Sequence, residues 1–105
     1  MSETKENGRI VVHVDKDIED LIPEYLELTK NDVATMRGAL ARSDFATLRS
    51  IGHTMKGSGG AYGFDSLTSI GGTIETLAKG GVGEELGKRI AELETYLDSV
   101  DIVFE

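Results

Sequence analysis

The chain has 105 residues and no cysteine; 39% of its residues are hydrophobic, 29% are charged, and Asp plus Glu outnumber Lys plus Arg by 19 to 11. This length suits one hydrophobic core but not a core plus a separate catalytic domain, and the lack of thiols excludes disulfides, cysteine nucleophiles and cysteine-ligated metals. A formal net charge of -8 disfavours nucleic acid as a partner, and no apolar run approaches the roughly 20 residues of a membrane span.

The first 14 residues are predicted to form a flexible, extended arm outside a helical domain that spans residues 15–105. Met1 to Arg9 is polar and lacks the apolar stretch of a secretory signal, so we expect a cytoplasmic protein. Residues 10–14 then form a short β-branched run, for which no second strand is evident. We therefore expect this run to pack as an extended arm.

A short leading helix is predicted next, capped by Asp15 or Asp17. The chain is expected to break near Pro23, which is tolerated in the first turn of the second helix. That helix runs to about Arg42, because its apolar residues recur at alternating steps of four and three. These residues are Ile22, Leu26, Thr29, Val33, Met36 and Leu40.

Three more amphipathic helices follow. Asp44 supplies an N-cap signal for the third helix, and Asp65 or Ser66 can cap the fourth, which ends at the Gly80-Gly81 pair. The fifth helix reaches roughly Asp101. The apolar face of the third helix consists of Phe45, Leu48, Ile51, Met55 and Tyr62. Short connections favour antiparallel neighbours, so we predict an all-α, up-and-down antiparallel four-helix bundle with a short leading helix and an extended N-terminal arm.

His53 projects from the third helix close to the side opposite its apolar face, so it should face solvent. A neutral imidazole presents a nucleophilic nitrogen near physiological pH and can accept a phosphoryl group. Arg49 and Lys56 project within roughly 60° of the same direction. Their charges could stabilise the transferred group, and Lys56, one turn away, is the stronger candidate. Gly57 and Gly60, on the same face, would leave room for a docking partner.

The stretch His53-Thr54-Met55-Lys56-Gly57-Ser58, followed by Gly63-Phe64, resembles the HxxKG(x)5G signature of histidine-containing phosphotransfer (HPt) domains. The resemblance extends along most of the chain, although Gly52 stands where alanine often precedes the histidine. It implies a four-helix bundle with His53 as phosphoacceptor and with Lys56 and Gly57 at motif positions. It also implies reversible exchange of the phosphoryl group with the aspartate of a response-regulator receiver domain. A Mg²⁺ ion would belong to the receiver, and no cofactor to this chain.

Two other interpretations compete with a phosphocarrier. The first is a helical scaffold that docks receiver or kinase domains without carrying phosphate. A hybrid histidine kinase is a further candidate partner of the phosphocarrier itself. The second interpretation is a metal site, but no HxxxH or ExxH spacing accompanies His53. A Walker-type phosphate loop is also lacking from the sequence, so we expect no ATP-dependent kinase activity. We expect a monomeric phosphocarrier that holds no metal and is not an enzyme.

Three apolar residues, Leu21, Tyr25 and Leu28, lie off the main apolar stripe of the second helix. They are candidates for docking a partner near the histidine. The alternative is that they cover the valine-rich arm, and the sequence leaves both interpretations open. His13 lies in the arm without a motif around it, and we assign it no role.

Overall fold

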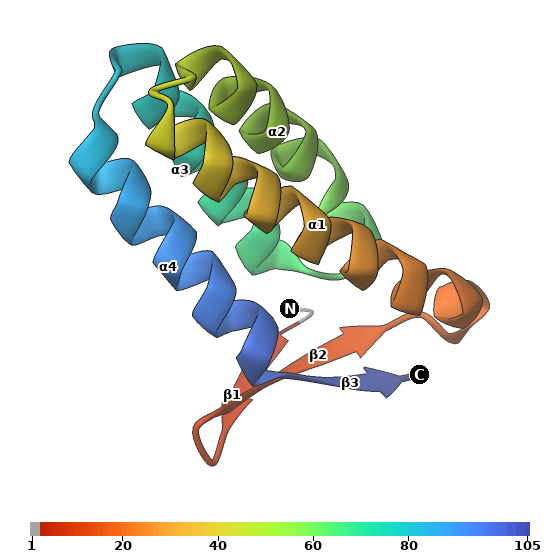
Figure 1. The fold of residues 1–105 in the computed structure, drawn as a ribbon. Coiled ribbons are helices and arrows are strands. Elements are labelled where there is room, and N and C mark those ends of the chain that lie inside the picture. Colours follow the sequence, from red (N-terminus) through yellow and green to blue (C-terminus); the bar gives the residue numbers. More distant parts are fainter. Residues whose placement is uncertain (1–2) are drawn as a thin grey trace.

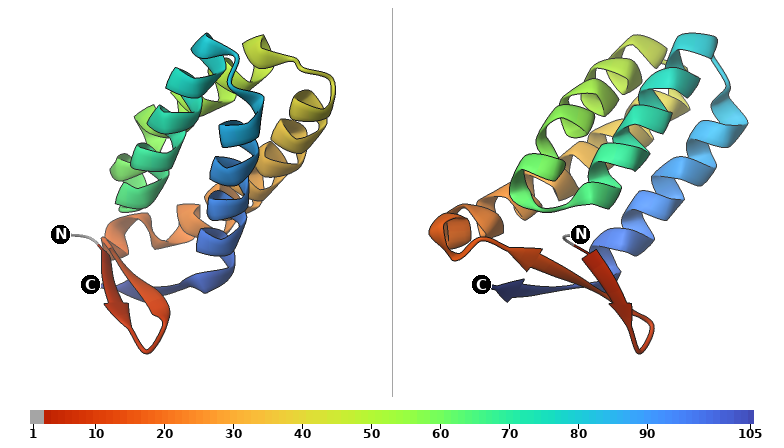
Figure 2. Two further views of the ribbon diagram at one scale, coloured as in Figure 1. Left: turned by 90° about the vertical axis from the view of Figure 1, so that its left-hand side faces the viewer. Right: turned by 180° about the vertical axis from the view of Figure 1, so that it is seen from behind.

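Four helices and a small sheet make up residues 3–105, which the computed structural model describes (Figure 1). The helices are α1 (Ile22–Ala41), α2 (Phe45–Ser58), α3 (Asp65–Gly80) and α4 (Gly83–Ser99). The strands are β1 (Glu3–Glu6), β2 (Arg9–Val14) and β3 (Val100–Phe104), and two 3-10 helices span Lys16–Leu21 and Gly60–Tyr62. The helices lie together, with the sheet at one end of them (Figure 2). The predicted mainly helical fold is confirmed.

The hydrophobic core lies between the helices and extends onto the sheet. Its largest fully buried side chains are Val12, Val14, Ile22, Met36, Leu48, Phe64, Leu67, Ile74, Leu86, Ile90 and Leu93. Val12 and Val14 come from β2, so the sheet closes one end of the helical core. None of the helices within residues 3–105 combines the length and hydrophobicity needed to cross a membrane.

The N-terminal segment is not an unpaired, flexible arm, and that prediction is wrong. β2 pairs antiparallel with β1 and parallel with β3, so Val12 lies opposite Glu3 on one side and Ile102 on the other. The hairpin turns at Asn7 and Gly8, which have φ of 52° and 78°. An Asn-Gly pair with positive φ is typical of a two-residue hairpin, so this part of the sheet had a local signal in the sequence.

The last helix is shorter than predicted because its C-terminal segment forms a strand. α4 ends at Ser99 rather than near Asp101, and Val100 begins β3. Residues 100–104 alternate between half-buried and exposed side chains, and they are mostly β-branched or aromatic, which favours a strand over a helix.

The predicted caps are partly confirmed. Asp15 caps the leading helix, which is a 3-10 helix, by accepting a hydrogen bond from the N–H of Asp17 at 2.9 Å. Asp44 caps α2 by accepting from the N–H of Thr47 at 3.1 Å. α2 ends at Ser58, earlier than expected, because a separate 3-10 helix, which begins at Gly60, carries Tyr62.

The N-terminus of α3 is capped from β1 rather than by Asp65 or Ser66. Its N-cap residue, Phe64, has no side-chain acceptor. The carboxylate of Glu3 instead accepts hydrogen bonds from the N–H of Ser66 at 2.9 Å and from its hydroxyl at 2.6 Å. The Tyr96 hydroxyl of α4 donates to the same carboxylate at 2.7 Å. Burial, and then the bond to Glu3, raise the pKa of Tyr96, so this phenol remains a donor.

We predict that Glu3→Ala lowers the free energy of unfolding by about 2 kcal/mol, because α3 loses a cap and Tyr96 loses its acceptor. Urea denaturation measures this change. Glu6→Ala, an exposed residue of the same strand, is the matched control and should change the midpoint little. Equal midpoints for the two variants would show that the Glu3 contacts add nothing to stability.

Candidate functional site

The site depends on an unusually close approach of α2 and α3. A Cβ atom placed on Gly52 would lie 2.8 Å from the carbonyl oxygen of Gly71, and one on Gly71 would lie 2.8 Å from the N atom of Lys56. A side chain at either position would therefore force the two helix backbones apart. Gly52 therefore serves the close packing of α2 against α3. This contact brings His53 of α2 beside Glu75 of α3.

His53 faces solvent, as predicted, with 69% of its side chain exposed. Its Nδ1 atom lies 2.8 Å from Oε2 of Glu75, whose side chain is only 9% exposed. An ionised carboxylate can only accept a hydrogen bond, so Nδ1 is the donor. The Nε2 atom then keeps its lone pair, and the imidazole is held as a nucleophile by a carboxylate that fixes its tautomer.

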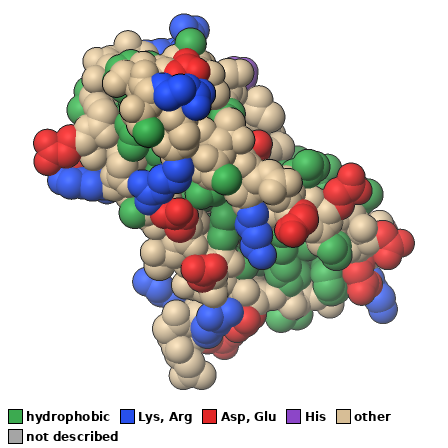
Figure 3. Space-filling model, viewed as in Figure 1, with side chains coloured by type: hydrophobic (Ala, Val, Ile, Leu, Met, Phe, Trp, Pro, Cys, Tyr) green, Lys and Arg blue, Asp and Glu red, His purple; other side chains and the backbone are tan. Residues whose placement is uncertain are grey.

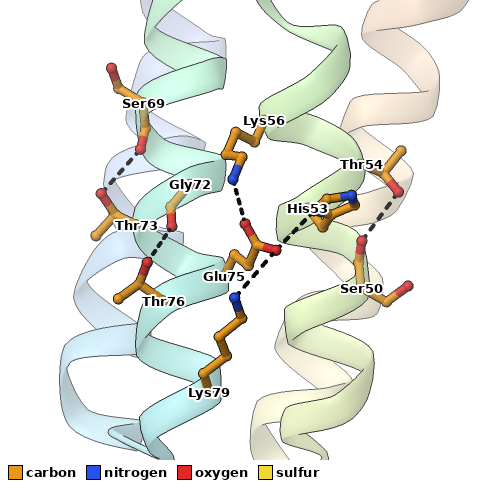
Figure 4. A network of polar contacts seen from close by, with 10 residues as sticks. All are labelled: Ser50, His53, Thr54, Lys56, Ser69, Gly72, Thr73, Glu75, Thr76 and Lys79. Carbon is orange, nitrogen blue, oxygen red and sulfur yellow. Dashed lines mark hydrogen bonds and ion pairs between the residues drawn. The ribbon is translucent and has the colours of Figure 1, made fainter.

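Glu75 is the centre of a polar network that joins α2 and α3 (Figure 4). Its Oε1 atom accepts a hydrogen bond from Nζ of Lys56 at 2.9 Å, and Nζ of Lys79 lies 3.9 Å from its Oε2 atom. The bond from Lys56, and then the bond from His53, lower the pKa of Glu75 from 4.5 to about 2. The carboxylate therefore stays ionised at neutral pH although it is nearly buried.

An open hollow beside His53 is lined mainly by polar side chains. Its lining residues are Ala46, Arg49, Ser50, His53, Glu75 and Lys79. Arg49 therefore lies next to the histidine, as predicted. Lys56 is not among the lining residues, because its aliphatic stem crosses α3 at Gly72, where an added Cβ would lie 3.1 Å from Cδ of Lys56.

Gly57 and Gly60, the two glycines predicted to leave room for a docking partner, have different surroundings. A Cβ on Gly57 would meet nothing within 4 Å, so this glycine leaves open space beside the motif. Gly60 lies beyond the end of α2, so the helical angle that placed it on the face of His53 does not apply. Its N–H donates to the hydroxyl of Thr68 at 2.8 Å.

Two of the three candidate docking residues, Tyr25 and Leu28, line a groove between α1 and α2. The groove is lined by Tyr25, Leu28, Thr29, Asp32, Thr54, Met55, Ser58 and Tyr62. Leu21 and Leu28 are 49% and 55% exposed, whereas Tyr25 stacks on Tyr62 with a centroid distance of 4.2 Å. Tyr25 packs against the core, so it serves the core as well as the groove.

Sequence analysis missed Glu75 and Lys79 as site residues. A signal for Glu75 was present, because it is a charged residue within the buried face of α3, and a carboxylate in such a place requires partners. The other buried side chains of that helix are Leu67, Ile70, Ile74 and Ala78. Lys79 follows Glu75 by one turn, a spacing that pairs charges on a helix. Within residues 3–105, no group of three or more His, Asp or Glu residues could hold a metal ion.

Comparison with known proteins gave one family match. A family model described as "Hpt domain" matches residues 20–102, which is more than half of the chain. The matched range contains α1 to α4 and every residue of the network around Glu75. No match was found among curated proteins or among solved structures.

Two glycines of α2 should respond oppositely to alanine. We predict that Gly52→Ala lowers the free energy of unfolding by about 2 kcal/mol, because its methyl group overlaps the backbone of α3. Gly57→Ala faces open space and should raise the free energy by up to about 1 kcal/mol through helix propensity. Urea midpoints of both variants test this. A Gly52→Ala protein as stable as the wild type would contradict the close helix contact.

Glu75 should make stability depend on pH. Its pKa is lowered in the folded state from 4.5 to about 2, so the ionised carboxylate stabilises the fold above pH 4.5, and this contribution is lost as the pH falls toward 2. We predict a smaller decline of the urea midpoint over that range in Glu75→Gln than in the wild type. Glu27→Gln, an exposed change on α1, is the control. Identical pH profiles for wild type and Glu75→Gln would refute the prediction.

Proposed function

The chain belongs to the Hpt domain family, whose members transfer phosphoryl groups through a histidine in two-component systems, and we propose that it is a phosphorelay carrier. His53 accepts a phosphoryl group from the aspartate of a receiver domain and returns it to such an aspartate. One observation carries this proposal: an exposed imidazole whose Nδ1 atom is bound to an ionised carboxylate at 2.8 Å, which leaves Nε2 free to react.

The transfer step needs no general base on this chain. The lone pair of Nε2 attacks phosphorus, the bond from phosphorus to the aspartyl oxygen breaks, and its electron pair remains on the receiver carboxylate. Nδ1 keeps its proton, so the imidazole becomes a cation as the N–P bond forms. Glu75 is already placed to stabilise that cation, in the way that a buried aspartate stabilises the imidazolium of a catalytic triad.

The same arrangement makes the transfer reversible. Neutral imidazole is a good leaving group from the protonated phosphoimidazole, because Nε2 takes the electron pair of the N–P bond and no proton has to move. In-line phosphoryl transfer depends mainly on positioning and electrostatics, which the network around Glu75 supplies on this side. The Mg²⁺ ion expected for the reaction belongs to the receiver.

We propose that the receiver docks on the groove between α1 and α2. Leu28 lines this groove and is exposed. Leu21, just before α1, is also exposed, and hydrophobic side chains gather near the N-terminal end of α1, with acidic side chains beside them (Figure 3). Gly57 leaves space next to the histidine. A patch of this kind provides an apolar centre with a charged rim, as transient interfaces do. We further propose a monomer of up-and-down topology that acts in the cytoplasm and has no kinase activity.

The two histidines of the chain allow a controlled test. His13 also has a carboxylate at Nδ1, that of Glu105, but its Nε2 atom lies 3.5 Å from the hydroxyl of Thr4 and its side chain is only 33% exposed. Incubation with a phosphorylated receiver and Mg²⁺ should place an acid-labile, alkali-stable label on the wild type and on His13→Gln. His53→Gln should remain unlabelled.

Two outcomes of this labelling would change the conclusion. If several receivers bind the wild type without labelling it, the domain is a docking scaffold. A label that persists in His53→Gln would place the phosphoacceptor at another residue.

A further inference from the structure

The three cations near Glu75 are held to different degrees. Lys56 is held at two points of its side chain: its aliphatic stem lies against Gly72, and its Nζ atom is 2.9 Å from Oε1 of Glu75. Nζ of Lys79 is 3.9 Å from Oε2, beyond hydrogen-bond length. The side chain of Arg49 makes no hydrogen bond or ion pair with other residues of the described range 3–105. Lys79 and Arg49 are therefore free to turn to another anion.

The two loosely held cations also share a location. Arg49 and Lys79 both line the hollow that His53 borders, one from α2 and the other from α3. Lys56 and Lys79 approach the carboxylate of Glu75 from opposite sides (Figure 4). The hollow thus has a cation on each of its two helices, and Lys56 lies on the far side of Glu75.

The charges around the hollow match a phosphoryl group. Arg49, Lys56 and Lys79 against the single carboxylate of Glu75 leave a surplus of two positive charges, on a protein whose net charge is -8. A phosphoryl group carries nearly two negative charges at neutral pH. The charge of Lys56 is already neutralised by its ion pair with Glu75. The positive charge that can bind a new anion therefore lies on Arg49 and Lys79.

We infer that Arg49 and Lys79 contact the oxygens of the phosphoryl group on His53, whereas Lys56 is a positioning residue that acts through Glu75. The inference rests on the proposed function and refines it, since it divides the roles of the cations. When the N–P bond forms, Lys79 exchanges its long contact with Glu75 for a phosphoryl oxygen. Lys56 keeps its bond, and Glu75 keeps the proton of the ring on Nδ1.

Methionine substitutions separate the two roles, because they keep the aliphatic stem and remove the charge. The variants are Arg49→Met, Lys79→Met and Lys56→Met. Lys88→Met is the matched control, since Lys88 is a surface cation of α4 whose one ion pair within residues 3–105 is with Glu85, at 3.4 Å. Two quantities are measured for each protein: the rate of label transfer from a phosphorylated receiver, and the ¹⁵N chemical shifts of the His53 imidazole before phosphorylation.

Arg49→Met and Lys79→Met should each slow transfer about tenfold, the effect of removing one charge at about 4 Å from an exposed anion. Their imidazole ¹⁵N shifts should equal those of the wild type, and Lys79→Arg should restore most of the rate. Lys56→Met should also slow transfer, but with altered imidazole shifts that report a smaller population of the Nδ1–H tautomer. Lys88→Met should match the wild type in both measurements.

The inference and the proposed function fail in different ways. A wild-type protein that no receiver labels overturns both. A labelled wild type with unchanged rates for Arg49→Met and Lys79→Met overturns the inference alone. The inference is also overturned if Lys56→Met slows transfer while its imidazole shifts stay those of the wild type, because Lys56 would then act on the phosphoryl group directly.

Discussion

The contact between the backbones of α2 and α3 at Gly52 and Gly71 is the constraint on which the site depends. Each glycine inside a helix costs on the order of 1 kcal/mol relative to alanine. The close approach that they allow places His53 within 2.8 Å of Glu75. A larger residue at either position would separate the helices and lengthen that hydrogen bond. The two glycines therefore preserve the orientation of the imidazole as well as the packing of the helices.

Across this close contact, Glu75 of α3 orients the imidazole of His53. A nearly buried carboxylate is tolerated only when partners replace its lost hydration, and here Lys56 and His53 both donate to it. The pair of Arg9 with Asp101, also at hydrogen-bond distance, has about half of each side chain exposed, and such surface pairs add little to stability. Burial thus distinguishes Glu75, which depends on its partners, from a surface carboxylate such as Asp101.

The sequence predicted those features that depend on local pattern. The helical period, the cap at Asp44 and the exposed position of His53 follow from spacing and side-chain type alone. The pairing of β2 with β1 had such a signal in the Asn7-Gly8 turn, although the strand of Glu3 is polar. The pairing with β3 had none, because Ile102 lies far along the chain. Glu75 was missed as a site residue because its role exists only when α3 lies against α2, a tertiary contact that periodicity does not specify.

The comparison of His13 with His53 shows what the surroundings add to a residue type. Both imidazoles have a carboxylate at Nδ1. The partner of His13 is Glu105, which is 62% exposed, whereas Glu75 is nearly buried and has cations around it. A carboxylate can therefore orient either ring. Of the two histidines, His53 is the one whose Nε2 atom is open and lies beside the loosely held cations Arg49 and Lys79. Those two conditions, rather than the histidine and its acidic partner alone, distinguish this position and support the proposed phosphocarrier role.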